Sequence, residues 1–102
     1  MIKTVTTALE DVKGKDIVVL DTRALSSLFD AMIIATGDSA RQVKALADRV
    51  CERAKERHDV EPRIEGHPGA QWVLVDLGNV IVQAMTPAAR DYYRLEELWT
   101  AA

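Results

Sequence analysis

Two short aliphatic runs on either side of the dipeptide Gly78-Asn79 constrain the fold more than any other part of the sequence. Residues 71–77 and 80–85 are rich in β-branched and large apolar side chains, and a two-residue Gly-X turn between such runs predicts a β-hairpin. A turn of this length fixes the register, so that Trp72 faces Met85. The sequence therefore predicts both the strands and the side chains that share each face of them.

The alternation along this hairpin gives it two unlike faces. One face is wholly aliphatic and is predicted to be core: Val73, Val75, Leu77, Val80, Val82 and Ala84. The other face mixes large apolar groups with polar ones: Trp72, Leu74, Asp76, Ile81, Gln83 and Met85. The pattern alone leaves two interpretations of this mixed face open. Either a helix covers it and Gln83 is a hydrogen-bonded, partly buried amide, or it is an exposed patch for a protein partner.

Further strands are predicted earlier in the chain than this hairpin. Residues 16–21 and 31–36 are short, continuous aliphatic runs, which are typical of strands buried on both faces. A short strand around Ile64 is a further candidate. Apolar side chains recur at helical spacing over residues 2–12, and Gly14 is expected to end that helix in a left-handed cap.

Two more helices are predicted from their start signals. Ser39 and Gln42 form a capping-box pattern, and the apolar positions that follow trace one face: Ala40, Val43, Leu46, Ala47, Val50 and Ala54. Residues 41–58 carry six basic and three acidic side chains, which we interpret as a solvated outer face, with docking as the alternative. Thr86 and Pro87 predict the start of a last helix. Its apolar positions are Ala88, Ala89, Tyr92, Tyr93, Leu95, Leu98 and Trp99.

The order of these elements is helix, strand, strand, helix, strand, strand, strand, helix. Such an order predicts an α/β fold, a mixed five-stranded sheet with flanking helices. No stretch has the composition of a linker or a repeat, and 102 residues suit one hydrophobic core. Residues 1–102 are therefore expected to form a single domain.

Composition excludes several classes of function. The 13 Lys and Arg against 16 Asp and Glu argue against direct nucleic-acid specificity, because phosphate contacts require an excess of cations. The single cysteine, Cys51, excludes an internal disulfide and a cysteine-based zinc site, and a buried thiol is expected. No apolar run approaches the roughly 20 residues of a membrane span, and the N-terminus has no targeting pattern. We therefore expect a cytoplasmic protein without a membrane partner.

The residue chemistry predicts no enzyme and no cofactor. Four aspartates lie near the ends of predicted strands: Asp21, Asp30, Asp38 and Asp76. No two of them have the Asp-x-Asp spacing that places two carboxylates on one strand face. His58 and His67 lack a third ligand at any usual metal-site spacing. The Gly37–Ser39 helix start resembles a phosphate cradle, which keeps a nucleotide-binding or nucleotidyltransferase-type enzyme as the alternative.

Several motifs occur in one order along the chain. The first half contains Lys13–Asp21, Ala35–Val43 and Ala45–Asp48, and the second half contains Glu65-Gly66, Trp72–Gly78 and the run from Arg90 to Trp99. In these motifs and in their order the chain resembles the Iojap family of ribosomal silencing factors. The resemblance covers nearly the whole chain.

This resemblance implies a non-enzymatic function. Family members are implied to bind the large ribosomal subunit through large-subunit ribosomal protein fourteen (uL14 type) on its intersubunit face. Binding there is implied to block joining of the small subunit and to repress translation. The implied fold is similar to the nucleotidyltransferase superfamily but lacks its catalytic aspartates. Bacterial members are implied to be cytoplasmic, and free members to form homodimers.

The resemblance also places the docking patch on the mixed hairpin face. It implies Trp72 as the aromatic anchor and Tyr93, in an Arg-x-x-Tyr-x-Leu-Glu pattern, as a second contact. The residues predicted to bind the partner are Trp72, Leu74, Asp76, Gln83, Met85 and Tyr93. Residues 65–99 hold five acidic and two basic side chains, and this acidic balance suits a basic ribosomal protein.

Overall fold

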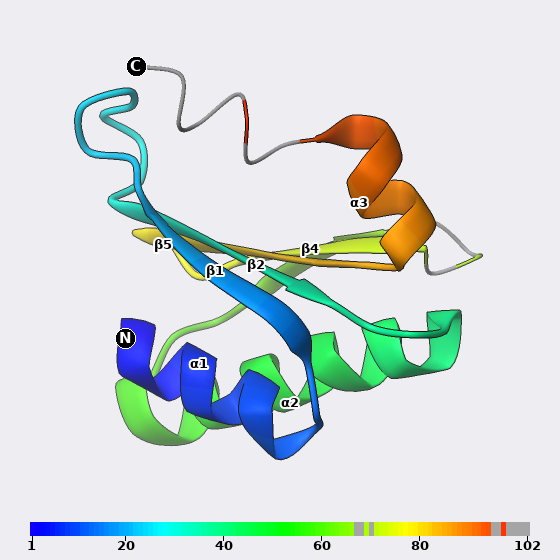
Figure 1. Cartoon of the computed structure of the whole chain (residues 1–102). Coiled ribbons are helices and arrows are strands. Elements are labelled where there is room, and N and C mark those ends of the chain that lie inside the picture. The colour runs from blue at the N-terminus through cyan, green and yellow to red at the C-terminus, as the bar shows by residue number, and fades with distance from the viewer. Residues whose placement is uncertain (67–68, 70, 95–96, 98–102) are drawn as a thin grey trace.

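Within residues 1–66, 69, 71–94 and 97, which the computed structural model describes, five strands form one mixed sheet with helices on both faces (Figure 1). The strands are β1 (Lys15–Asp21), β2 (Ala31–Thr36), β3 (Arg63–Gly66), β4 (Trp72–Asp76) and β5 (Val80–Met85). The helices are α1 (Ile2–Asp11), α2 (Ala40–His58) and α3 (Pro87–Tyr93). The predicted α/β class and order of elements are confirmed.

The strands lie in the order β1-β2-β5-β4-β3. β2 and β5 pair in parallel, and the other neighbours pair antiparallel. β1 and β3 therefore form the two edges of the sheet. Helices α1 and α2 cover one face and α3 lies on the other (Figure 1). None of the helices in the described ranges combines the length and the apolar composition needed to cross a bilayer.

The hairpin of β4 and β5 has the predicted register, with Trp72 opposite Met85 and Asp76 opposite Ile81. The amide of Leu77 donates to the carbonyl oxygen of Val80 at 3.0 Å and closes the two-residue turn. Gly78 takes a positive φ of 94°, as the first position of such a turn requires.

The larger core lies between the sheet and the helices α1 and α2. All six side chains of the aliphatic hairpin face are buried in it, as predicted. α2 contributes Val43, Leu46, Ala47, Val50, Cys51 and Ala54. Ala40, at the start of the predicted face, is only partly buried. Burial raises the pKa of the Cys51 thiol, which fits the expected structural role.

The prediction that residues 16–21 form a strand buried on both faces is wrong. β1 is an edge strand in which Leu20 alone is buried, and Val19 is 45% exposed. Its pairing with β2 shifts register between Lys15 and Val18, and Asp16 has a positive φ of 48° at this bulge. A bulge at an edge is a usual device against pairing with further strands. β2, by contrast, is buried at every position, as predicted.

The ends of two helices also differ from the sequence predictions. After α1, Lys13 and not Gly14 takes the left-handed conformation, with φ 59°. The Lys13 amide donates to Glu10 and the Gly14 amide to Leu9, so the chain turns one residue earlier, in a Schellman motif. α3 begins at the predicted cap but ends at Tyr93. The predicted apolar positions Leu95, Leu98 and Trp99 lie outside the described residues.

Candidate docking surface

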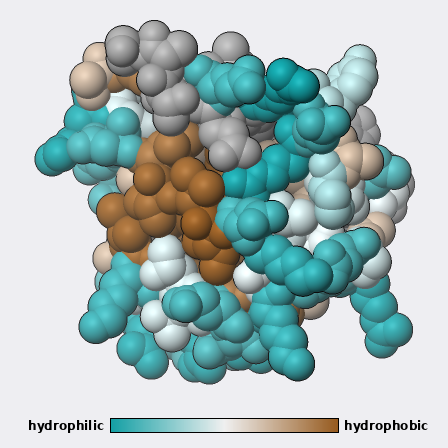
Figure 2. Space-filling view, in the orientation of Figure 1, coloured by the Kyte–Doolittle hydropathy of each residue, from teal (hydrophilic) through white to brown (hydrophobic). Residues whose placement is uncertain are grey.

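The sheet face that carries α3 is only partly covered. A second, smaller cluster of buried side chains lies on this face: Leu20, Met32, Ile34, Met85 and Ala89. Around it, Val18, Phe29, Trp72 and Ile81 are partly buried. Among the described residues, the seven-residue helix α3 shields only one part of this face. Figure 2 shows hydrophobic surface gathered over β1, at one edge of the sheet.

The mixed hairpin face is divided into accessible and buried side chains. Four of them are partly buried and keep accessible surface: Trp72, Leu74, Asp76 and Ile81. Gln83 is 5% exposed and Met85 is 0% exposed, so the prediction that these two belong to an exposed patch is wrong. The physical reason is α3, since Ala89 packs into the same cluster as Met85. A covering helix therefore accounts for one end of the face, and the other end remains open to a partner.

Trp72 lies in a row of three aromatic rings. Its ring centroid is 4.6 Å from that of Tyr93, with 43° between the ring planes. Tyr93 meets Tyr92 edge-on, at a centroid distance of 5.0 Å. Tyr93 is 46% exposed and Tyr92 is 82% exposed. The structure thus places Tyr93 beside Trp72, as expected of a second contact, and adds Tyr92, which no motif singles out.

Two hollows flank Trp72. One, of about 530 Å³, lies between β4 and α3 and is lined by Gly69, Gln71, Trp72, Ala88, Ala89, Tyr92 and Tyr93. The other, of about 310 Å³, is lined by Glu65, Gly66, Trp72 and Leu74. Glu65 reaches this hollow because β3 pairs with β4 and sets Glu65 opposite Leu74. Reasoning from the sequence includes Glu65 in a motif and in the acidic balance but does not place it beside Leu74, since the pairing of a four-residue strand is not encoded in its own pattern.

Accessible residues around these hollows form the candidate site, together with Asp76, which follows Leu74 on the same face of β4. We name it the Trp72 surface, and it consists of Glu65, Trp72, Leu74, Asp76, Tyr92 and Tyr93. Asp76 is fixed by the hairpin turn, because its Oδ1 accepts a hydrogen bond from the Gly78 amide at 2.8 Å. Arg63 lies opposite Asp76 in the register of β3 and β4. Aromatic rings with a polar rim are the usual composition of a protein-binding site.

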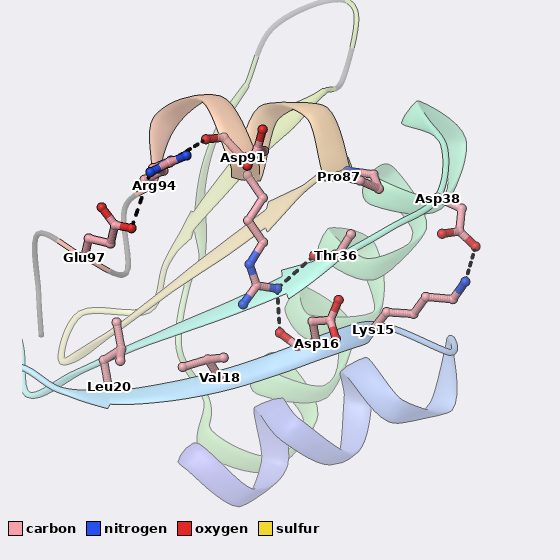
Figure 3. Close-up of a pocket in the computed structure, with 11 residues that line it drawn as sticks. Lys15, Asp16, Val18, Leu20, Thr36, Asp38, Pro87, Asp91, Arg94 and Glu97 are labelled. Carbon is pink, nitrogen blue, oxygen red and sulfur yellow. Dashed lines mark hydrogen bonds and ion pairs between the residues drawn. The ribbon is translucent and has the colours of Figure 1, made fainter.

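A polar groove of about 800 Å³ lies between α3 and the strands β1 and β2 (Figure 3). Lys15 Nζ bonds Asp38 Oδ2 at 2.7 Å, and this hydrogen bond raises the pKa of Lys15. The Arg90 guanidinium donates to Thr36 Oγ1 at 2.8 Å and to the carbonyl oxygen of Asp16. The bulge in β1 therefore supplies an acceptor that holds α3 against the sheet.

The Gly37–Ser39 helix start, where a phosphate cradle was the alternative, lies beside this groove. The amide of Gln42 donates to Ser39 Oγ at 3.1 Å, and the amide of Asp38 donates to Gln42 Oε1 at 2.7 Å. Two of the N–H groups that a phosphate would use are thus already bonded. Among the described residues, no group of three or more His, Cys, Asp or Glu side chains could hold a metal ion. The hydrogen bonds at Gly37–Ser39 are those of an ordinary helix start.

Comparison with known proteins gives one consistent family. The family model described as "Ribosomal silencing factor during starvation" matches residues 1–102. The chain is similar to ribosomal silencing factor RsfS of Chromobacterium violaceum, at 59% identity over 92 residues that cover 90% of this chain and 75% of that protein. RsfS of Bacillus subtilis is 37% identical over 99 residues, which cover 97% of this chain and 84% of that protein.

Solved structures show the same likeness. A crystal structure of a Chromobacterium violaceum protein matches with a TM-score of 0.93 at 56% identity, and covers 97% of this chain and 82% of that one. A Bacillus halodurans protein matches with a TM-score of 0.85 at 36% identity, and covers 96% of this chain and 91% of that one.

Proposed function

The chain belongs to the family of ribosomal silencing factors (RsfS), non-enzymatic regulators of translation, and we propose that it docks on the large ribosomal subunit through the Trp72 surface and thereby excludes the small subunit. The proposed partner is the ribosomal protein uL14 on the intersubunit face. A mouse relative supports the choice of subunit, since it is named "Mitochondrial assembly of ribosomal large subunit protein 1". That relative is 30% identical over 95 residues, which cover 90% of this chain and 42% of the mouse protein.

The observation that carries this proposal is the arrangement around Trp72. The indole ring lies between two hollows and next to two exposed tyrosines, so a partner side chain can reach it from either hollow. Buried aromatic anchors of this kind contribute most of the free energy of many protein interfaces. The buried Gln83 accepts a hydrogen bond from the ring, and the buried Met85 lies opposite Trp72 on β5.

The charge around the Trp72 surface supports a basic partner. Glu65 and Asp76 belong to the surface itself, whereas the neighbouring polar groove holds acidic and basic side chains together. Ribosomal proteins are commonly rich in Lys and Arg, so opposite charges would face each other on docking. Complementary charge mainly speeds and orients association, and its effect falls as salt concentration rises.

Silencing by this route needs no chemical step. The protein measures 33 × 33 × 22 Å along its principal axes, which is enough to separate two surfaces that must meet closely. We place the activity in the cytoplasm, where bacterial ribosomes assemble and translate. The partly covered apolar face also supports the proposal that free protein pairs as a homodimer when no ribosome is available. We also propose that the fold is similar to that of the nucleotidyltransferases but lacks their catalytic residues.

Co-sedimentation with separated ribosomal subunits tests the proposal. The wild-type protein should pellet with large subunits and not with small ones. Trp72→Ala should weaken this binding by about 30-fold or more, equivalent to about 2 kcal/mol for an aromatic anchor. Ile64→Ala is the matched control, because Ile64 is exposed on a neighbouring strand but pairs with Val75, whose side chain points to the opposite face. Wild-type binding to Trp72→Ala, with its fold intact by circular dichroism, would refute the placement of the surface.

A further inference from the structure

The side-chain amide of Gln83 is hydrogen-bonded to the indole ring of Trp72. Trp72 Nε1 donates a hydrogen bond to Gln83 Oε1. The two residues are diagonal neighbours on one sheet face, because Trp72 pairs with Met85 and Leu74 pairs with Gln83. An indole N–H is a donor only, so the oxygen of the amide must face the ring. The amide nitrogen then points away from Trp72 and lies 3.9 Å from Met32 Sδ.

Burying the side-chain amide of Gln83 at its position in the sheet costs free energy. Gln83 lies on β5, between Leu74 on β4 and Ile34 on β2. The side chain is 5% exposed, and its neighbours on this face form the smaller apolar cluster. A buried amide in apolar surroundings loses its water and regains only the hydrogen bonds the protein offers. An apolar side chain of the same size would fill this site without that loss, so packing alone does not account for the glutamine.

The hydrogen bond explains why a glutamine is found at position 83, because it sets the orientation of the Trp72 ring. The indole ring has two edges, and only one carries the N–H group. Because the N–H is directed to a buried amide, the part of the ring that stays accessible is hydrocarbon. Tyr93, at a centroid distance of 4.6 Å, limits the ring from the side of α3. The ring is therefore held in one orientation before any partner arrives.

We infer that Gln83 is a positioning residue that presents the hydrocarbon edge of Trp72 to the partner and does not itself touch the partner. This inference rests on the proposed function and specifies the partner chemistry at Trp72. The partner should offer an apolar or flat cationic contact to the ring, such as a methionine, a leucine or a stacked arginine. A hydrogen-bond acceptor directed at the indole N–H would find that group already occupied.

Gln83→Met is the main test, because methionine has similar volume and cannot hold the indole N–H strongly. A second substitution, Trp99→Phe, leaves Trp72 as the only tryptophan, since the chain has two. In this background, hydrogen exchange of the indole N–H by nuclear magnetic resonance reports the bond directly. The N–H should be protected when residue 83 is glutamine and should exchange faster in Gln83→Met. Thermal stability should be unchanged or higher in Gln83→Met, which a role in packing alone would not predict.

Docking provides the second readout. Gln83→Met should bind large subunits about 3–10-fold more weakly, the range expected when one hydrogen bond no longer orients a group. In a Trp72→Phe background the same substitution should leave binding unchanged, because phenylalanine has no N–H group to orient. Gln83→Glu keeps an acceptor oxygen in place and should restore protection of the N–H, at a cost in stability from the buried carboxyl group.

The possible results separate this inference from the function on which it rests. If the wild-type protein binds no ribosomal subunit, the proposed function fails, and the inference fails with it. If wild type binds, Trp72→Ala does not, and Gln83→Met binds like wild type, the function stands and only the positioning role is overturned. Protection of the N–H that persists in Gln83→Met also overturns it. Faster exchange together with weaker docking and unchanged stability supports it.

Discussion

Replacing Gly37 with alanine tests whether the junction between β2 and α2 is as closely packed as the structure shows. Gly37 is buried, and its amide donates to the carbonyl oxygen of Met85 at 2.9 Å. A Cβ atom at this position would lie 2.9 Å from Val43 N and 3.1 Å from Val43 Cγ2. The nearest atom belongs to the backbone of the first turn of α2, which Ser39 caps, so it cannot move aside as a flexible side chain would.

The expected loss of stability follows from this geometry. Overpacking of a well-packed site costs about 1–3 kcal/mol, and a backbone obstacle places Gly37→Ala near the middle of that range, at about 2 kcal/mol. For a domain of this size, each kcal/mol lowers Tm by about 4–8 °C. Gly37→Ala should therefore unfold at a temperature about 8–16 °C below the wild type. The same loss should appear as a lower midpoint in urea at an unchanged slope.

Two other glycines provide controls that separate the physical causes. A Cβ at Gly69 would meet nothing within 4 Å, and the residue has no positive φ, so Gly69→Ala should be neutral or gain up to about 1 kcal/mol. A Cβ at Gly78 would also be in open space, but φ is +94° there, so Gly78→Ala measures backbone strain alone, at about 1–2 kcal/mol. If Gly37→Ala proves as stable as Gly69→Ala, the close contact with Val43 is not present and the reasoning is refuted.

Two further predictions concern hydrogen bonds made by arginine side chains. Arg90→Gln should lower the affinity for large subunits several-fold and the free energy of unfolding by about 1–2 kcal/mol, because it removes the hydrogen bonds to Thr36 and the Asp16 carbonyl that hold α3. Titration with large subunits measures the change in affinity. Hydrogen bonds from Arg23 lower the pKa of Asp21 to about 2 from 3.8, so their stabilising effect is complete above pH 4 and is lost as pH falls towards 2. Urea unfolding of Asp21→Asn and wild type should therefore differ at pH 7 and converge near pH 2; equal stabilities at pH 7 would contradict it.

The sequence was sufficient for the hairpin because all the information is local. A two-residue turn admits one register, so the pairing of Trp72 with Met85 follows from counting residues. The exposure of β1, by contrast, depends on information outside its own segment of the sequence. β1 and β2 are both continuous aliphatic runs, yet β2 has a strand on each side and β1 has one. The position of a strand in the sheet order depends on a parallel pairing of β2 with β5, and no pattern within residues 16–21 records that pairing.

The candidate site shows the same division between local and distant information. Alternation along the hairpin predicts that Trp72, Leu74 and Gln83 share a face, and this is confirmed. The burial of Met85 depends on where α3 packs, and one contact that holds α3 is the hydrogen bond from Arg90 to the Asp16 carbonyl at the bulge in β1. A bulge between Lys15 and Val18, 54 residues or more before the first strand of the hairpin at Trp72, cannot be inferred from the hairpin itself.

The fold accounts for a docking site without any active-site chemistry. Among the described residues, α1 and α2 together place 29 helical residues on one face of the sheet, whereas α3 places seven on the other. A sheet face that is left partly open must either meet a partner or risk aggregation. In the open part, Trp72 is hydrogen-bonded to Gln83 and packed against Tyr93, so we expect its ring to be held in place before a partner binds. A rigid anchor loses little conformational entropy on binding. Silencing by exclusion requires tight docking and nothing further, so this uneven covering of the sheet is sufficient for the function we propose.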